Sequence, residues 1–270
     1  MDRAQYEAER FFYHSPVTLY SVSKLFNFNP DVDDEKVDVY RRSLMKILRK
    51  RYHVQDNSLT ETLTIDQDIE WMTLPANSSL TLHFIFIHGV DMNRIHRVCL
   101  ATDNDSNSGV LLTSCSHLMA NLICEWIEKT FDCQIHPLPI SDQFLLQQYK
   151  DYLSRSLEND AIADSQLIFS TPTAKPDLRT ISVSLPGEDM SQIYRRIQDK
   201  DGSSIFNAIL QYIHREANLD LNRFKLERVN CGGFVMTTTG KIKFFRQYYT
   251  FDQLIDLVFG LLQIALGKMI

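Results

Sequence analysis

Consecutive β-type segments without an intervening helix constrain the fold of this chain most strongly. The run LTLHFIFIHGV (80–90) is followed by IHRVCLAT (95–102) after a short turn that is predicted to start at Gly89. A third run, LTETLTI (59–65), precedes them and is also rich in residues that favour strands. Because antiparallel neighbours can be joined by a short turn, the pattern predicts an antiparallel meander.

The remaining elements alternate without a regular strand–helix–strand repeat, which predicts an α+β fold. Further strands are predicted at residues 15–28, 166–172, 178–185, 224–230 and 234–245, the last with a turn at Thr239-Gly240, and helices at 35–54, 116–131, 142–160, 188–198, 203–218 and 250–266. Apolar content falls after Leu157, which favours a boundary at residues 158–165. We expect two subdomains with mainly antiparallel sheets flanked by helices: an N-terminal domain at 1–160 and a C-terminal dimerisation domain at 161–270.

Composition narrows the class of protein. Hydrophobic and charged residues make up 44% and 23% of the chain, as in ordinary globular proteins. No uninterrupted apolar run reaches the roughly 18 residues of a membrane span, and the first residues are charged where a signal peptide is apolar. Five scattered cysteines favour free thiols in a reducing compartment, so we expect a protein of the cytosol or nucleus without membrane contact.

The stretch CEWIEKTFDCQIHPLPIS (124–141) admits two interpretations, a metal or thiol site and a helix-to-strand junction. Cys124 falls within an apolar helical pattern, while Cys133 and His136 follow it on a short extended segment. Zinc ligands usually come in closely spaced pairs, which this stretch lacks. The spacing therefore favours the junction, and we expect no metal.

The chain also lacks the recurrent motifs of catalysis and nucleotide binding. Walker A, dinucleotide-binding, zinc-protease and nucleophile-elbow patterns are all missing from the sequence. We therefore expect neither an enzyme nor a cofactor, although a dispersed active site in a cytosolic enzyme stays an alternative.

The predicted helix at 35–54 carries a dense positive cluster. No acidic residue occurs between Arg41 and Tyr52, and the apolar residues of this helix form a separate stripe. Cations on one helical face neutralise phosphates without reading sequence, although such a face is often merely solvated. The predicted DNA-binding residues are Arg41, Arg42, Lys46, Arg49, Lys50 and Arg51; Arg223, Lys225 and Arg228 form a weaker second cluster.

The C-terminal strands are predicted to form a small sheet that the apolar helix at 250–266 covers. Edge strands offer unpaired backbone groups to a partner, while lysines on an edge can also serve to prevent aggregation. The predicted partner-binding residues lie between 224 and 245: Phe224, Lys225, Phe234, Lys241, Lys243, Phe244 and Phe245.

Several stretches together resemble one known family. The segments VTLYSVSKLFNF, EWIEKTFDCQIHPLPIS, LRTISVSL and TTGKIKFF are similar, in this order, to segments of centromere protein L, a subunit of the constitutive centromere-associated network of the inner kinetochore. The stretch at 126–141 is the most specific, and the length of the chain resembles a compact fungal member.

The resemblance implies a non-catalytic scaffold subunit in the nucleus, at the centromere and kinetochore. Its implied partner is centromere protein N, joined through the C-terminal sheets into a heterodimer that helps attach the network to centromeric nucleosomes and DNA for chromosome segregation. Centromere protein C and other inner-kinetochore subunits are further implied partners, and a homodimer is implied for the isolated chain. The alternative that the residues leave open is a free-standing DNA-binding protein without sequence specificity that uses the basic helix.

Overall fold

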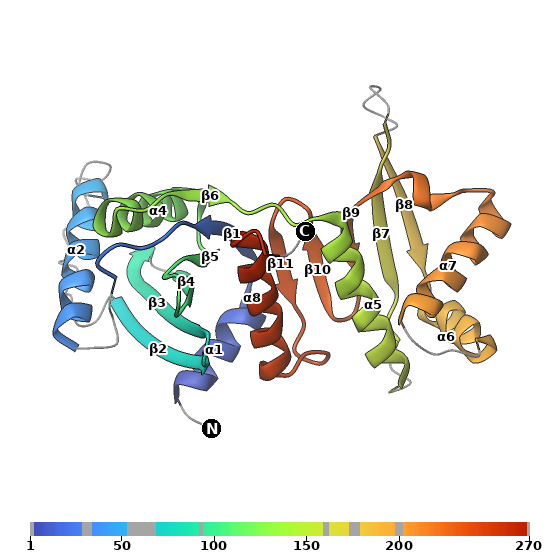
Figure 1. The fold of residues 1–270 in the computed structure, drawn as a ribbon, viewed down its shortest axis with the longest axis horizontal. Helices are drawn as coiled ribbons and strands as arrows, with labels where there is room; N and C mark the ends of the chain where they lie inside the picture. Colours follow the sequence, from blue (N-terminus) through green and yellow to red (C-terminus); the bar gives the residue numbers. More distant parts are fainter. Residues whose placement is uncertain are drawn as a thin grey trace. The chain divides into compact units, whose positions relative to one another are not determined.

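The protein is described from a computed structural model, in which the described residues are 3–28, 34–52, 69–91, 94–158, 162–172, 179–197 and 202–268. The chain forms two compact units (Figure 1). Unit 1 comprises Met1–Leu138 and Phe251–Ile270, and unit 2 comprises Pro139–Thr250. Each unit is an antiparallel sheet packed against helices, so the α+β class predicted from the sequence is confirmed.

Unit 1 is built on a meander of four strands that are consecutive in sequence, β2 to β5, and the first strand of the chain, β1, pairs with β5. The strands lie in the order β2–β3–β4–β5–β1, and β6 also pairs with β1. Their bounds are β1 Val17–Val22, β2 Ile69–Asn77, β3 Leu80–Asp91, β4 Arg94–Asp103, β5 Gly109–Ser114 and β6 Ile135–Pro137. The predicted β3–β4 hairpin is confirmed, with Phe84 opposite Cys99.

Alternate side chains of the unit 1 sheet enter two apolar layers. Ile85, Val98 and Leu111 face the helices α2 (Asp34–Tyr52) and α4 (His117–Phe131) in one core cluster around Trp126. Phe84, which precedes Ile85 in β3, faces the other side of the sheet and packs against Phe11 of α1 (Arg3–His14), with ring centroids 5.6 Å apart. The helix α8 (Phe251–Ala265) packs on β1, β4 and β5. A strand whose two faces are both buried reads as a continuous apolar run, which explains FIFI in β3.

A buried histidine links three strands of unit 1. His83 is 1% exposed, and its ring nitrogens lie 3.1 Å from Thr73 Oγ1 and 3.3 Å from Thr102 Oγ1. The Phe28 ring packs edge-on against it at 5.0 Å. Because burial penalises the charged imidazolium, the pKa of His83 is lowered to about 3.

Acidification is expected to destabilise unit 1 through His83. Since its folded pKa lies below the unfolded value of 6.5, the unfolded chain binds more protons between these values, and stability is lost as the pH falls below about 6.5. The histidine should contribute a loss of about 1.4 kcal/mol between about pH 7.5 and 5.5. Urea unfolding of the protein and of His83→Gln at both pH values measures this loss, which the variant should lack. Equal losses in the two proteins would contradict the prediction.

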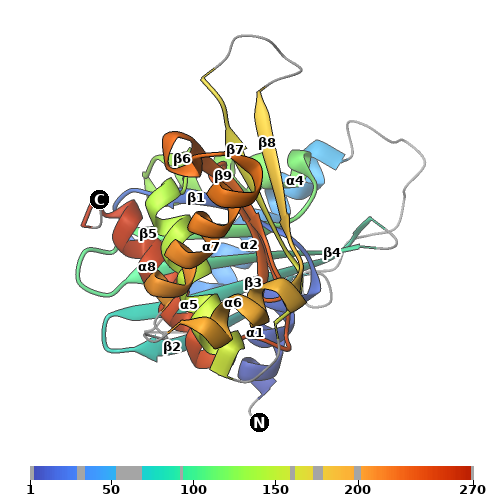
Figure 2. The ribbon, with the colours of Figure 1, turned by 90° about the vertical axis from the view of Figure 1, so that its right-hand side faces the viewer.

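Unit 2 is an antiparallel sheet with helices on one face. The strands lie in the order β11–β10–β9–β7–β8. Their bounds are β7 Ser165–Ser170, β8 Thr180–Leu185, β9 Lys225–Asn230, β10 Phe234–Thr237 and β11 Lys241–Phe244. The helices α5 (Asp142–Glu158), α6 (Gly187–Arg196) and α7 (Gly202–Ala217) lie together beside these strands (Figure 2). Buried Leu167, Val229 and Met236 point to the helical side, while alternate residues such as Ser182 stay exposed.

The β10–β11 turn and two helix starts follow local sequence signals. Gly240 has φ 76°, a left-handed conformation that suits glycine, so the predicted turn at Thr239-Gly240 is confirmed. The helix α8 begins at Phe251, directly after Thr250, a residue type that favours the N-cap position. Ser116 caps α4 by accepting a hydrogen bond from the Met119 backbone N–H at 3.4 Å.

Several elements differ from the sequence prediction. The strand β3 continues through Gly89 to Asp91 before it turns, because an irregularity in the ladder between Ile87 and Asp91 accommodates the glycine. The strands β2 and β5 and the helix α1 had no predicted counterpart. The predicted strand at 59–65 lies outside the described residues.

The two compact units also divide the chain differently from the expected boundary near residue 160. The helix α5 packs on β9 and α7 and so belongs to unit 2, whereas α8 packs on the strands of unit 1 instead of covering the C-terminal sheet. The helix α8 is apolar nearly all round, which demands burial but does not specify which sheet supplies it.

Candidate functional site

The exposed side of α2 is a basic face. Arg42, Lys46, Arg49 and Lys50 are all exposed, and their spacing of four, seven and eight residues from Arg42 places them on one side of the helix. The opposite side of α2 is anchored in the core by the buried side chains of Tyr40, Leu44, Met45 and Leu48. Because the apolar stripe is fixed in the core, the cations are held towards solvent.

Two predicted members of the DNA site differ from these four. Arg41 is 19% exposed, and its guanidinium donates to Asp38 Oδ1 and to the Ile69 carbonyl, both at 2.9 Å. These contacts hold α2 against β2, so Arg41 serves in packing. The backbone of Arg51 lies in α2, but its side chain is outside the described residues. We call Arg42, Lys46, Arg49 and Lys50 the α2 basic face.

The face of the unit 2 sheet opposite the helices is also rich in cations. Lys225, Arg228 and Lys241 are exposed, and Lys243 is half-buried with Nζ 5.4 Å from the Phe245 ring. Thr237 lies opposite Arg228 on the neighbouring strand, and its Oγ1 accepts a hydrogen bond from the Lys241 backbone N–H at 3.2 Å. Arg228 and Lys241 therefore lie on the same part of the sheet. This surface contains the Lys225 and Arg228 of the weaker predicted cluster, whereas Arg223 pairs with Asp220 at 3.1 Å.

The predicted partner-binding residues divide by burial. Phe234 and Phe244 are 0% and 1% exposed and pack in the core against Tyr249. Phe224 and Phe245 are half-buried at the surface. The three predicted lysines, Lys225, Lys241 and Lys243, belong to the basic side of the sheet described above.

The position of each strand in the unit 2 sheet decides which backbone groups can pair with another chain. The strand β9 pairs with β7 and β10, and β10 pairs with β9 and β11, so both are interior strands. The strand β8 pairs with β7 and ends the strand order. Nothing in the sequence marks TISVSL as terminal, because sheet order depends on pairing between segments about 60 residues apart.

The ladder between β7 and β8 identifies the outward groups of β8. The Thr171 N–H donates to the Arg179 carbonyl at 2.8 Å, immediately beyond the paired strands. Antiparallel pairs alternate between hydrogen-bonded and non-hydrogen-bonded, and the β7–β8 register is uninterrupted. The backbone groups of Thr180, Ser182 and Ser184 therefore point away from β7. Their side chains are exposed and uncharged.

The cysteine-containing stretch is a helix-to-strand junction, as predicted. The helix α4 ends at Phe131, Asp132 adopts the left-handed conformation with φ 47°, and β6 starts at Ile135. Burial raises the pKa of the Cys124 thiol to about 12 and that of Cys133 to about 11, so both stay protonated. Within the described ranges, no three His, Cys, Asp or Glu side chains gather as a metal site would require, and no helix is long and apolar enough to span a membrane.

These features define an α+β protein whose candidate sites are surfaces for macromolecules: a basic helix face, a basic sheet face and a terminal strand. Comparison with known proteins supplies the family. The sequence profile of centromere protein L matches residues 11–265, and the chain therefore belongs to the centromere protein L family. This family acts at the centromere and kinetochore in the nucleus, and the resemblance seen in the sequence is confirmed.

Individual relatives are similar over part of the chain. The chain is 31% identical over 138 residues to inner kinetochore subunit fta1 of Schizosaccharomyces pombe, which covers 49% of this chain and 46% of that protein. It is 27% identical over 130 residues to centromere protein L of Mus musculus, covering 46% of this chain and 39% of that protein. For centromere protein L of Gallus gallus, the identity is 25% over 154 residues, and the shares are 54% and 43%. The matches thus span less than half the length of each of these relatives.

Proposed function

We propose that this chain is a non-catalytic scaffold subunit of the inner kinetochore that pairs with centromere protein N through the sheet of unit 2. The observation that carries the proposal is the terminal strand β8, whose Thr180, Ser182 and Ser184 direct backbone groups away from β7. An added strand would satisfy these groups by continuing the sheet. No lysine on β8 opposes such pairing.

This assignment refines the expected interface at residues 224–245. Interior strands β9 and β10 have both edges occupied, so they can contribute side chains but no strand edge. Lys225, Lys241, Lys243, Phe224 and Phe245 remain surface candidates for further partner contacts. Centromere protein C and other inner-kinetochore subunits are the proposed users of these side chains within the assembly.

The heterodimer is proposed to attach to centromeric nucleosomes and DNA with the α2 basic face. Four exposed cations on one side of a well-anchored helix can contact consecutive phosphates without reading bases. The basic side of the unit 2 sheet is a second candidate for the same role. The same α2 face supports the alternative of a free-standing DNA-binding protein.

Co-expression with centromere protein N distinguishes these functions. Light scattering is expected to show a stable 1:1 complex that replaces the species formed by the chain alone. Two folded proteins that elute separately would contradict the scaffold proposal. If the chain alone then bound DNA as tightly as the mixture, the free-standing DNA-binding function would be supported.

A further inference from the structure

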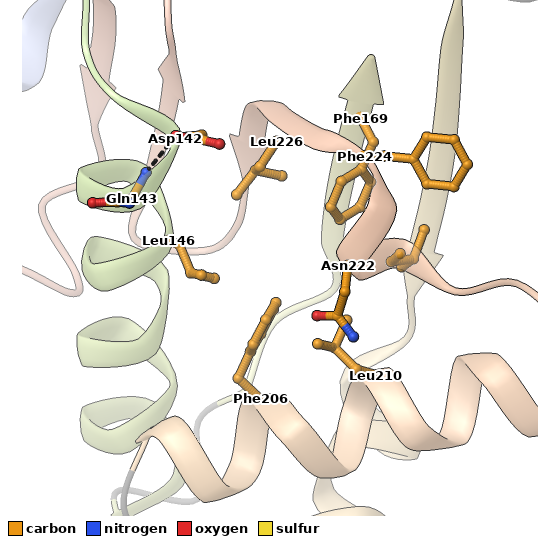
Figure 3. A pocket seen from close by; sticks show the side chains of 10 residues that line it. Asp142, Gln143, Leu146, Phe169, Phe206, Leu210, Asn222, Phe224 and Leu226 are labelled. Atoms are coloured by element: carbon orange, nitrogen blue, oxygen red, sulfur yellow. Dashed lines mark hydrogen bonds between the residues drawn. The ribbon is translucent and has the colours of Figure 1, made fainter. Parts of the chain in front are cut away.

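Unit 2 contains an apolar pocket on the side of the sheet that carries the helices, and one of its lining residues, Phe224, is also a candidate for further partner contacts. It lies between α5, α7 and the strands β7 and β9, with a volume of about 180 Å³. The lining residues are Asp142, Gln143, Leu146, Phe169, Phe206, Leu210, Leu221, Asn222, Phe224 and Leu226. Figure 3 shows Leu146, Phe206 and Leu226 converging on the space from α5, α7 and β9.

The wall of the pocket is rigid, and its mouth is polar. Phe169, Phe206 and Leu226 are 4–5% exposed, so their positions are fixed by packing. Gln143 and Asn222 are exposed, and Asp142 is half-buried next to Gln143 in the first turn of α5, whereas Asn222 lies across the space beside Leu210 (Figure 3). Among the lining residues, Asp142 is the charged one. Lys150, whose Nζ lies 5.8 Å from the Phe206 ring, does not line the pocket.

Size and charge together specify the occupant. A cavity of about 150 Å³ can hold a benzene ring, so this pocket accommodates one aromatic side chain. A carboxylate at the mouth of an apolar site favours a neighbouring cation and opposes a neighbouring anion. We propose that the pocket binds a peptide segment of another protein that presents an aromatic side chain next to Arg or Lys.

The segments of this chain that are not described cannot supply the aromatic side chain that the pocket would bind. Residues 1–2, 29–33, 53–68, 92–93, 159–161, 173–178, 198–201 and 269–270 contain no Phe, Trp or Tyr. A second copy of the chain is the competing occupant, because Phe26 is 50% exposed and Lys24 Nζ lies 5.6 Å from its ring. Peptide binding and self-association distinguish a peptide of another protein from a second copy of this chain.

The binding test uses three capped dipeptides followed by methyl NMR of the full chain. N-acetyl-Arg-Trp-amide is expected to shift the methyl signals of Leu146, Leu210 and Leu226 with a dissociation constant on the order of 1 mM. N-acetyl-Glu-Trp-amide should bind about two- to five-fold more weakly, and N-acetyl-Arg-Ala-amide should leave these signals unchanged. No shift at about 10 mM Arg-Trp peptide, or equal affinity for the Glu-Trp peptide, would overturn the proposal.

Variants test whether the peptides bind in this pocket and whether Asp142 causes the preference for Arg over Glu. Asp142→Asn should abolish the preference for Arg over Glu, whereas Asp252→Asn, which removes an acid from the first turn of α8 in unit 1, should preserve it. Leu210→Trp should fill the half-exposed side of the pocket and remove peptide binding. If Leu210→Trp fails to fold, Asp142→Asn decides by itself, because it changes no volume. An unchanged preference in Asp142→Asn would overturn the assignment.

The mass of the chain in solution tests whether a second copy of the chain fills the pocket. If a second copy fills the pocket, the chain alone should show a concentration-dependent mass that both Phe26→Ala and Asp142→Asn abolish. That result would overturn the proposal of a separate partner protein. A mass that neither variant changes is the expected outcome. These readouts need no centromere protein N or DNA, so they are independent of the function proposed above.

Discussion

Replacement of Arg42, Lys46 and Lys50 with Glu is expected to lower the affinity of the heterodimer for DNA by about two orders of magnitude at about 50 mM salt. The three side chains are exposed on one side of α2, so each can release counterions from a phosphate. Because each phosphate contact contributes about 0.9 to the slope of log affinity against log salt, the slope should flatten by about 2.7. A fluorescence-anisotropy salt series measures both effects.

A matched variant controls for net charge. Lys129→Glu on α4 and Arg195→Glu and Arg196→Glu on α6 together change the formal charge equally, at positions outside α2 and outside the strands of the unit 2 sheet. This variant should keep most of the affinity and the original slope. Should both triple variants lose affinity equally, the effect would reflect total charge, and the α2 basic face would be excluded as the DNA site.

Ser182→Pro is expected to weaken the complex with centromere protein N by about 10- to 100-fold. The Ser182 N–H points away from β7, so proline removes a donor from the pairing edge while the ladder to β7 is kept. A partner carbonyl left without a donor costs about 1–3 kcal/mol. Ser182→Val retains the N–H and should bind normally. Isothermal titration calorimetry gives the comparison, and unchanged affinity in Ser182→Pro would exclude β8 as the pairing edge.

Local signals in the sequence predict much of the secondary structure. The strands β3 and β4 follow from continuous β-branched and aromatic residues, and α4 from its apolar face and Ser116 cap. The strand β2 was missed because Pro75 interrupts a segment that is half-buried along most of its length. For β5, the apolar run GVLLTS was short and adjoined a polar loop.

The order of strands in a sheet and the contacts of individual side chains depend on residues far apart in the sequence, so no local pattern predicts them. The charge pattern of α2 correctly predicted exposed cations at Arg42 and Lys46, but Arg41 bonds the carbonyl of Ile69, 28 residues away. The sequence placed the partner-binding edge within residues 224–245, whereas the terminal position of β8 follows from the pairing of β7 with β9. The pocket likewise combines residues from α5, β7, α7 and β9, and its apolar members resemble ordinary core residues in the sequence.

Hydrogen exchange of β8 tests the proposed assembly most directly. The amides of Thr180, Ser182 and Ser184 point away from β7, so they should exchange rapidly in the isolated chain if it is monomeric under the measurement conditions. Binding of centromere protein N should slow their exchange, whereas interior amides of β9 should change little. Slower exchange at these three positions would support pairing through β8. Unchanged exchange there in a verified 1:1 complex would contradict it and return attention to the surface residues between Phe224 and Phe245.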